Sequence, residues 1–277
     1  MKDPFVLGTI LAHPDDETFG VGGSLIRYAD EGVNVHSLCL TRGERGWNGD
    51  PERPAVPRGH LGEARAAELA EAGRRMGLAS TTCLAYPDGD LAGVARDGVV
   101  RDIVRWVRLV RPDVVITWGP DGGYGHPDHI AAGERATRAV ELAGIARHEP
   151  ELGDHVHVKR CYRFVIQAEF IDSLVRLMPE FAEYMTTLAT KPQRWTHDRL
   201  GALIDVSALM DRKWDAMQAH RTQTPDLNMW QRVRQAEPQI LTQEAFIRVF
   251  PEPGGPPLET DLFVVLKARA AAALRPS

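Results

Sequence analysis

The sequence predicts an α/β fold built on a mostly parallel sheet, and two observations carry this prediction. From residue 5 to about residue 147, short apolar runs typical of strands alternate with longer segments whose apolar residues recur at helical spacing. Such alternation indicates βαβ units, in which helices cover both faces of a parallel sheet. The 277 residues, 43% hydrophobic and 26% charged, suit one large globular domain of this class.

The clearest elements lie before residue 150. Apolar runs predict strands at 5–12, 33–40, 81–85 and 114–118. Helical spacing predicts helices at 20–31, 61–77, 99–110 and 128–147. The segment 41–60 is rich in Gly and Pro and is expected to be a loop, which either closes over a substrate as a lid or is simply solvated.

The pattern is less regular after residue 150. Strands are expected at 160–166, 202–206, 246–250 and 262–267, and helical segments at 207–220 and 225–242. No repeat or low-complexity linker separates this part from the first. We expect one continuous domain with a smaller C-terminal α+β portion, in which residues 1–150 form the catalytic core and residues 151–277 complete the sheet and the substrate pocket.

Composition excludes several classes of protein. The net charge of −5 and the lack of a Lys/Arg cluster argue against a nucleic-acid partner. Cys39, Cys83 and Cys161 are too far apart for a thiolate metal motif, and their usage suits a reducing cytoplasm. No apolar run approaches the roughly 20 residues of a membrane-spanning helix. The run at 5–12 is expected to be a buried strand rather than part of a signal peptide.

Two short segments carry candidate metal chemistry, and each follows a predicted strand: AHPDDE at 12–17 and GHPDH at 125–129. Ligands of parallel sheets bind beyond the carboxyl ends of the strands, so the two segments are expected to converge. A catalytic zinc site uses three protein ligands and keeps one position open. His13, Asp16, His126 and His129 compete for these three places, while a carboxylate beside the metal, such as Asp15, can take a proton from water.

Structural roles for the same residues stay open at this point. The acidic run at 15–17 could serve only as favourable charge at the start of a helix, and a histidine after a strand is often an ordinary polar residue. The coincidence of two His-Pro-Asp turns in one chain favours the metal interpretation.

AHPDDE followed at a distance by HPDH resembles the paired motifs of the LmbE-like, or PIG-L, family. That family includes N-acetylglucosaminyl-phosphatidylinositol de-N-acetylases and the deacetylases of mycothiol and bacillithiol synthesis. The similarity covers most of residues 5–147 and a fragment at 213–223. It implies a Rossmann-like fold and a zinc-dependent N-deacetylase whose metal is bound by His13, Asp16 and His129.

The resemblance also implies roles for residues around the metal. Asp15 becomes the general base, His126 stabilises the tetrahedral intermediate or assists the leaving amine, and Tyr124 helps to polarise the carbonyl. Four further residues become candidates for substrate binding: Arg65, Asp88, Arg42 and His220. Each has a plain structural alternative, such as a solvated helix arginine, an ordinary Pro-Asp-Gly turn, an ordered loop or a helix-terminal histidine.

The expected substrate is an N-acetylated amino sugar or glycoside, which is hydrolysed to a free amine and acetate. One alternative is an amidase for thiol–sugar conjugates, and another is a non-catalytic sugar or metal binder. A nucleotide-binding Rossmann enzyme is disfavoured, because the glycines at 20–23 lack the GxGxxG spacing. His and carboxylate ligands also accept iron, cobalt or manganese. The composition is compatible with a homo-oligomer.

Overall fold

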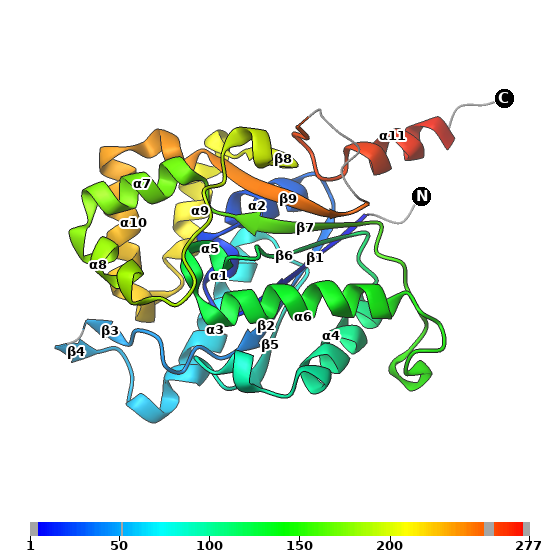
Figure 1. Cartoon of the computed structure of the whole chain (residues 1–277), viewed down its shortest axis with the longest axis horizontal. Helices are drawn as coiled ribbons and strands as arrows, with labels where there is room; N and C mark the ends of the chain where they lie inside the picture. The colour runs from blue at the N-terminus through cyan, green and yellow to red at the C-terminus, as the bar shows by residue number, and fades with distance from the viewer. Residues whose placement is uncertain (1–4, 51, 252–257, 274–277) are drawn as a thin grey trace.

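The computed structural model describes residues 5–50, 52–251 and 258–273, and its centre is a seven-stranded sheet (Figure 1). The strands occur in the spatial order β5-β2-β1-β6-β7-β9-β8. Their bounds are β1 Val6–Leu11, β2 Asn34–Thr41, β5 Ser80–Tyr86, β6 Val114–Trp118, β7 Arg160–Val165, β8 Ala202–Asp205 and β9 Gln243–Phe250. The five strands from β5 to β7 are parallel, whereas β9 runs antiparallel to β7 and to β8.

The chain reverses its direction across the sheet between β1 and β6. From β1 it proceeds outward through β2 to β5, and it then returns to β6 and continues to β7. Right-handed crossovers place the helices of the first half on one face and those of the second half on the other. The first group is α2 Gly22–Asp30 and α3 Leu61–Met76, and the second is α4 Arg96–Val110 and α6 Pro127–Ala143, which pack against each other (Figure 1).

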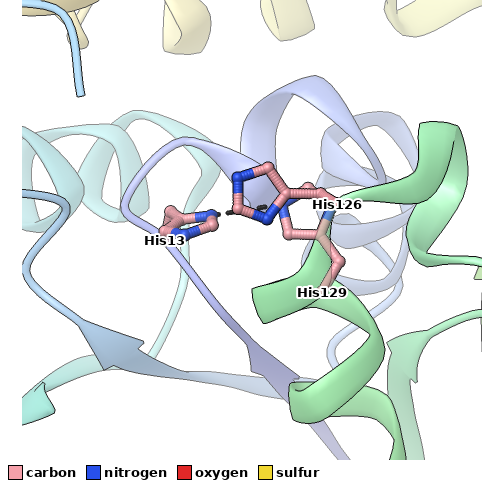
Figure 2. Close-up of side chains that lie close together, drawn as sticks. All are labelled: His13, His126 and His129. Atoms are coloured by element: carbon pink, nitrogen blue, oxygen red, sulfur yellow. Dashed lines mark hydrogen bonds between the residues drawn. The ribbon is translucent and has the colours of Figure 1, made fainter. Parts of the chain in front are cut away.

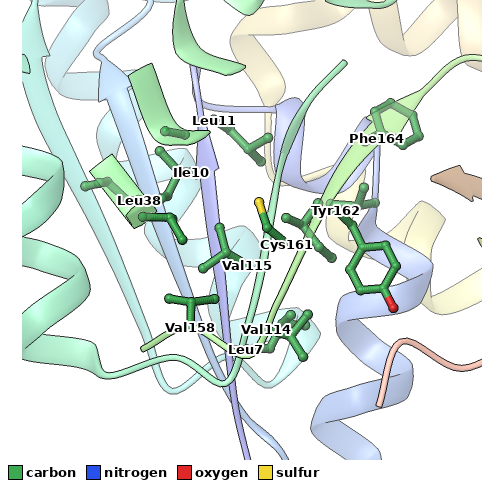
Figure 3. Packing of buried hydrophobic residues seen from close by; sticks show 14 of the residues in the cluster. Leu7, Ile10, Leu11, Leu38, Val114, Val115, Val158, Cys161, Tyr162 and Phe164 are labelled. Carbon is green, nitrogen blue, oxygen red and sulfur yellow. The ribbon is translucent and has the colours of Figure 1, made fainter. Parts of the chain in front are cut away.

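The central strands are apolar along nearly their whole length because helices cover both faces of the sheet. All five residues of β6 are buried, as are five of the six in β1. Figure 3 shows part of the core that these strands form, with Leu7 of β1 beside its sheet partner Val114 of β6. This rigid centre carries the loops that leave the strand ends.

Residues after position 150 extend the same sheet and add a helical group beside it. The helices are α7 Ala168–Leu177, α8 Pro179–Thr187, α9 Met210–Met217, α10 Thr224–Ala236 and α11 Val264–Ala273. α9 packs on α2 and α3, while α7 packs on α8 and α10 at one side of the sheet (Figure 1). None of the helices within the described ranges is long and apolar enough to cross a membrane.

Most predicted elements are present, but the strand predicted at 262–267 is wrong. Residues from Val264 onward form α11, while Leu262 and Phe263 are buried in the core. Periodicity alone does not distinguish a short apolar run in a strand from one in a helix, and the alanine-rich sequence that follows favours the helix. α7 and α8 were not predicted, and the segment 41–60 contains a short hairpin of β3 Gly49–Asp50 and β4 Arg53–Pro54.

Two helical glycines have opposite surroundings, which gives a matched test of the packing. A methyl group on Gly23 of α2 would lie 2.6–2.9 Å from three side-chain atoms of Val206, whereas one on Gly98 of α4 would have no neighbour within 4 Å. We expect Gly23→Ala to lower the free energy of unfolding by about 1–3 kcal/mol. We expect Gly98→Ala to raise it by up to about 1 kcal/mol. Urea unfolding measures both, and changes of the same sign would contradict this packing.

Candidate metal centre

The two His-Pro-Asp segments meet where the strand order reverses. One follows β1 and the other follows β6, and these strands are neighbours in the sheet. A reversal of this kind opens a crevice beyond the carboxyl ends of the strands, where ligands of α/β sheets bind. Figure 2 shows His13 from the first segment facing His126 and His129 from the second.

Asp16, the first residue of the short helix α1 Asp16–Phe19, uses its two carboxylate oxygens differently. Oδ2 accepts hydrogen bonds from the backbone N–H groups of Ala12 and His13, at 3.0 and 2.9 Å, and from the indole of Trp118 at 2.9 Å. Oδ1 instead lies 3.3 Å from His129 Nε2. One oxygen therefore fixes the turn after β1, and the other is directed at the histidines.

The outer nitrogen of each facing histidine is held by an acceptor. His129 Nδ1 lies 3.1 Å from the carbonyl oxygen of Gly122, and His13 Nε2 lies 3.1 Å from Asp88 Oδ1 and 3.4 Å from Asp128 Oδ2. A carbonyl or a carboxylate only accepts, so the outer nitrogens must carry the hydrogens. In the neutral rings, the inner nitrogens, His13 Nδ1 and His129 Nε2, then present lone pairs to each other across 3.1 Å.

Two imidazole lone pairs thus face each other with a carboxylate beside them, an arrangement that a cation would satisfy. His13 Nδ1 and His129 Nε2 are 3.1 Å apart, Asp16 Oδ1 is 3.3 Å from His129 Nε2, and Asp16 Oδ2 is 3.9 Å from His13 Nδ1. Burial alone would lower the pKa of His13, but hydrogen bonds to Asp128, Asp16 and Asp88 raise it well above its usual value. The surroundings therefore stabilise positive charge here, and two imidazoles with one carboxylate fit a divalent metal with an open coordination position.

Within the described residues, two groups of potential ligands have all their donor atoms close together, and both include His13: one with His126 and His129, the other with Asp88 and Asp128. Asp88 and Asp128 lie at the outer nitrogen of His13, but Asp88 also accepts the N–H of Arg45 in the loop after β2, and Asp128 accepts the N–H groups of Gly89 and Leu91 after β5. His126 lies near the facing histidines, with its ring centroid 4.5 Å from that of His129. Its Nδ1 accepts from the N–H of Asp128, which leaves the hydrogen on Nε2. The outer carboxylates therefore orient His13, and His126 presents a donor.

Asp15 lies beside this centre in a strained conformation. Its φ of 127° is in a region that residues other than glycine rarely adopt. Glu17 Oε2 accepts its backbone N–H at 2.9 Å, and Arg65 donates to its Oδ2 at 2.9 Å. Burial raises the pKa of Asp15 to about 7, although the positive charge of Arg65 opposes the rise. A carboxylate with this pKa can both take and return a proton near neutral pH.

Tyr124 and His126 form the aromatic side of the centre. The Tyr124 ring centroid lies 5.6 Å from that of His129 and 5.9 Å from that of His126. Burial raises the pKa of Tyr124 well above 10, so its hydroxyl keeps its hydrogen. Burial, helped by positive charge on His129 and His13, lowers the pKa of His126 to about 3, so His126 is neutral. Both side chains are therefore hydrogen-bond donors rather than charges.

Two of the predicted substrate-binding residues lie in the centre, but their polar atoms bind other residues of the protein. Arg65 is buried and donates to the carbonyls of Gly43 and Pro14 as well as to Asp15. Asp88 uses Oδ1 at His13 and Oδ2 to accept from the N–H of Arg45. Burial would raise the pKa of Asp88, but His13 and that N–H lower it to about 2. We interpret both as residues that position the catalytic groups.

The other two predicted substrate residues lie outside this cluster. Arg42 is exposed, and its Cβ lies over Gly62 at the start of α3. His220 is fully buried, and its Nε2 lies 2.8 Å from Glu17 Oε1. Glu17 also holds the N–H of Asp15, so His220 is connected to Asp15 through Glu17, and its charge also acts on Asp15. This geometry would let His220 position Asp15.

Several contributors were missed in the sequence because their types suggest ordinary roles. Glu17 and Asp128 belong to the two motifs but were assigned no role of their own, yet both are buried against the site. Asp226, in the first turn of α10, was not singled out. Its negative charge contributes to the raised pKa values of Asp15 and Tyr124. Nothing local in the sequence joins residue 226 to residue 15.

The chain is similar in sequence to proteins whose activity is known. Residues 9–140 match the model of the family described as PIG-L, GlcNAc-PI de-N-acetylase. The 1D-myo-inositol 2-acetamido-2-deoxy-alpha-D-glucopyranoside deacetylase of Rhodococcus jostii is 33% identical over 274 residues, which cover 86% of this chain and 89% of the relative.

Solved structures share the fold. The N,N'-diacetylchitobiose deacetylase of Pyrococcus horikoshii superposes with a TM-score of 0.66 and 21% identity, covering 91% of this chain and 88% of the other. The 4-carboxy-2-hydroxymuconate hydratase of Pseudomonas putida KT2440 has a TM-score of 0.63 and 20% identity, with coverage of 91% and 99%. Because a hydratase also has this fold, the shape alone does not decide the reaction.

The carboxylate behind His13 gives a test of the metal centre. We expect Asp88→Asn to weaken metal binding by about 10–100-fold, because the outer nitrogen of His13 loses its charged acceptor. Competition with a chromophoric chelator measures the affinity. Asp172→Asn, at an exposed ion pair with Arg194, serves as the control and should bind metal as the unmodified protein does. Equal affinities for both variants would argue against metal binding through His13 Nδ1.

Proposed function

The chain belongs to the PIG-L family of GlcNAc-PI de-N-acetylases, and we propose that it removes the acetyl group from a glycoside of N-acetylglucosamine. The observation that carries the proposal is the pair of inner histidine nitrogens, His13 Nδ1 and His129 Nε2, which face each other beside the carboxyl groups of Asp16 and Asp15. A Lewis-acid site next to a group that can exchange a proton near neutral pH suits the hydrolysis of an amide. The Rhodococcus relative acts on an inositol glycoside, which makes a cyclitol glycoside the first substrate to test.

Zinc is the metal that we propose for this centre, with His13, Asp16 and His129 as its ligands. Two imidazoles and one carboxylate form a donor set of catalytic zinc sites, and the hydrogen bonds at the outer nitrogens orient both rings. When bound, zinc supplies a Lewis acid that polarises the amide carbonyl and makes water acidic enough to react near neutral pH. The same donors also accept iron, cobalt or manganese.

Asp15 is the residue that we propose to move the proton. Arg65 occupies its Oδ2, which leaves Oδ1 to take a proton from the attacking water. Because the pKa of Asp15 is raised to about 7, the carboxyl group can then return this proton to the departing amine. The strained backbone, held by Glu17, keeps the carboxyl group in place during both steps.

His126 and Tyr124 act as neutral donors in this proposal. The hydrogen on His126 Nε2 and the phenolic hydrogen of Tyr124 can both stabilise the oxygen that becomes negative when the carbonyl is attacked. With a pKa lowered to about 3, His126 carries no spare proton near neutral pH. We therefore assign the protonation of the amine to Asp15 rather than to His126.

Two variants separate the proton-transfer role from metal binding. Asp15→Asn should retain the metal but lose about 10²–10⁴-fold in kcat, the usual contribution of a general base. His13→Ala should lose the metal itself, because it removes one of three ligands. Elemental analysis by mass spectrometry and steady-state kinetics measure the two effects. Normal turnover by Asp15→Asn would contradict the general-base assignment.

A substrate panel tests the reaction and its main alternative. The metal-loaded protein should release amine from N-acetylglucosaminyl inositol and from N,N'-diacetylchitobiose, with Asp15→Asn as the inactive control. A thiol–sugar amide conjugate forms the third arm, and faster hydrolysis of that compound would favour the alternative amidase. Release of amine from none of the three would contradict the proposed function.

A further inference from the structure

Two exposed aromatic side chains stand close to the centre. Trp47, in the loop between β2 and α3, is 48% exposed, and Tyr184, on α8, is 42% exposed. Among residues whose side chains are described, no other Trp, Tyr or Phe has so exposed a side chain. An exposed aromatic side chain gains free energy when a ligand covers it and excludes water. Two such residues beside a catalytic centre therefore indicate a ligand-binding surface.

Asp226 connects the two aromatic residues. Its carboxylate accepts a hydrogen bond from the side chain of Trp47, and its charge acts on Tyr184 and also on Tyr124. Asp226 is therefore a partner of Trp47 and lies within electrostatic reach of Tyr184 and Tyr124. Burial raises the pKa of Asp226 to about 6, although Arg65 and Trp47 lower it, so its oxygens are partly withdrawn from water. A hydrogen bond to such an oxygen is stronger than one in bulk solvent.

Trp47 is held from two directions. Gln223 Nε2 donates to its carbonyl oxygen at 2.9 Å, while Asp226 accepts from its indole. The neighbouring Gly46 lies against Arg65, since a methyl group there would approach Arg65 Nη1 to 2.0 Å. This part of the loop is thus joined both to α10 and to the arginine that holds Asp15. A ring fixed in this way loses little conformational freedom when a ligand packs on it.

Tyr184 is connected to the residues at the metal centre through the ring of Tyr124. Tyr124 is 5.6 Å from His129 between ring centroids, and Tyr184 is a further 6.4 Å from Tyr124. The acetylated sugar must place its amide at the metal, so its own ring lies near Tyr124. A unit attached to that sugar could then reach Tyr184, which packs on Tyr124.

We propose that Trp47, Tyr184 and Asp226 form a subsite for a second polyhydroxylated ring, the one to which the acetylated amino sugar is linked. This inference rests on the proposed function, because that reaction sets which ring lies at the metal. The apolar faces of a sugar or cyclitol ring pack on the aromatic side chains, and its hydroxyl groups donate to the carboxylate. The protein thereby selects glycosides over the free amino sugar.

The selectivity between two substrates measures this subsite. For the unmodified protein and its variants, kcat/KM is determined on N-acetylglucosaminyl inositol and on free N-acetylglucosamine. In Trp47→Ala, we expect the ratio of the two values to fall about tenfold, as for the loss of one buried apolar contact. Trp47→Phe should recover most of the ratio, and Leu109→Ala, at an exposed position on α4, should leave it unchanged. An unchanged ratio in Trp47→Ala overturns the proposal.

A binding experiment separates this proposal from the proposed reaction. Calorimetry gives the Kd of N-acetylglucosaminyl inositol for metal-loaded Asp15→Asn, with and without Trp47→Ala. A Kd about tenfold higher without the indole supports the subsite, even if the unmodified protein releases no amine and the deacetylase proposal fails. Equal Kd values overturn the subsite while leaving any measured deacetylation intact.

Discussion

Asp16 joins the two halves of the site through its two carboxylate oxygens. Oδ2 collects two backbone N–H groups of the turn after β1 and the indole of Trp118 at the end of β6, so the turn and the neighbouring strand are fixed together. Oδ1 is then left facing His129. The buried negative charge is stabilised by these donors and by the histidines, which hold the pKa of Asp16 well below its usual range although burial opposes this. Without Asp16, His13 Nδ1 and His129 Nε2 would face each other with no carboxylate of Asp16 beside them.

The fold brings the two loops of the site together, and neighbouring residues then orient their catalytic side chains. The reversal between β1 and β6 brings two loops that are more than 100 residues apart to one edge of the sheet. Asp88 and Asp128 then fix His13, Gly122 fixes His129, and Glu17 holds the strained backbone of Asp15. Each catalytic group is therefore restrained by a second residue, as precise catalytic geometry requires. Strain at Asp15 persists because the surrounding hydrogen bonds determine its conformation.

The sequence predicts the parallel part of the sheet well, because strands buried on both faces are continuous apolar runs. It also predicts which strand ends bear the chemistry, since AHPDDE directly follows β1 and HPDH begins at residue 126, shortly after β6 ends at Trp118. The sequence predicts less well the features that depend on contacts between residues far apart in the chain. α8 has no buried residue and thus no clear apolar stripe, while the Ala-rich α11 begins with a run that resembles a strand. The roles of Arg65, Asp88 and His220 depend on the partners that each side chain meets across the fold, which spacing along the chain does not reveal.

The central claim is that His13 Nδ1, His129 Nε2 and Asp16 Oδ1 hold one divalent cation. Anomalous diffraction from crystals of the zinc-loaded protein, recorded on both sides of the zinc absorption edge, locates the metal directly. We predict one strong peak within about 2.0–2.2 Å of these three atoms, with an open coordination position toward Asp15. A peak bound by His126 in place of Asp16, or one at His13 Nε2 between Asp88 and Asp128, would contradict the account.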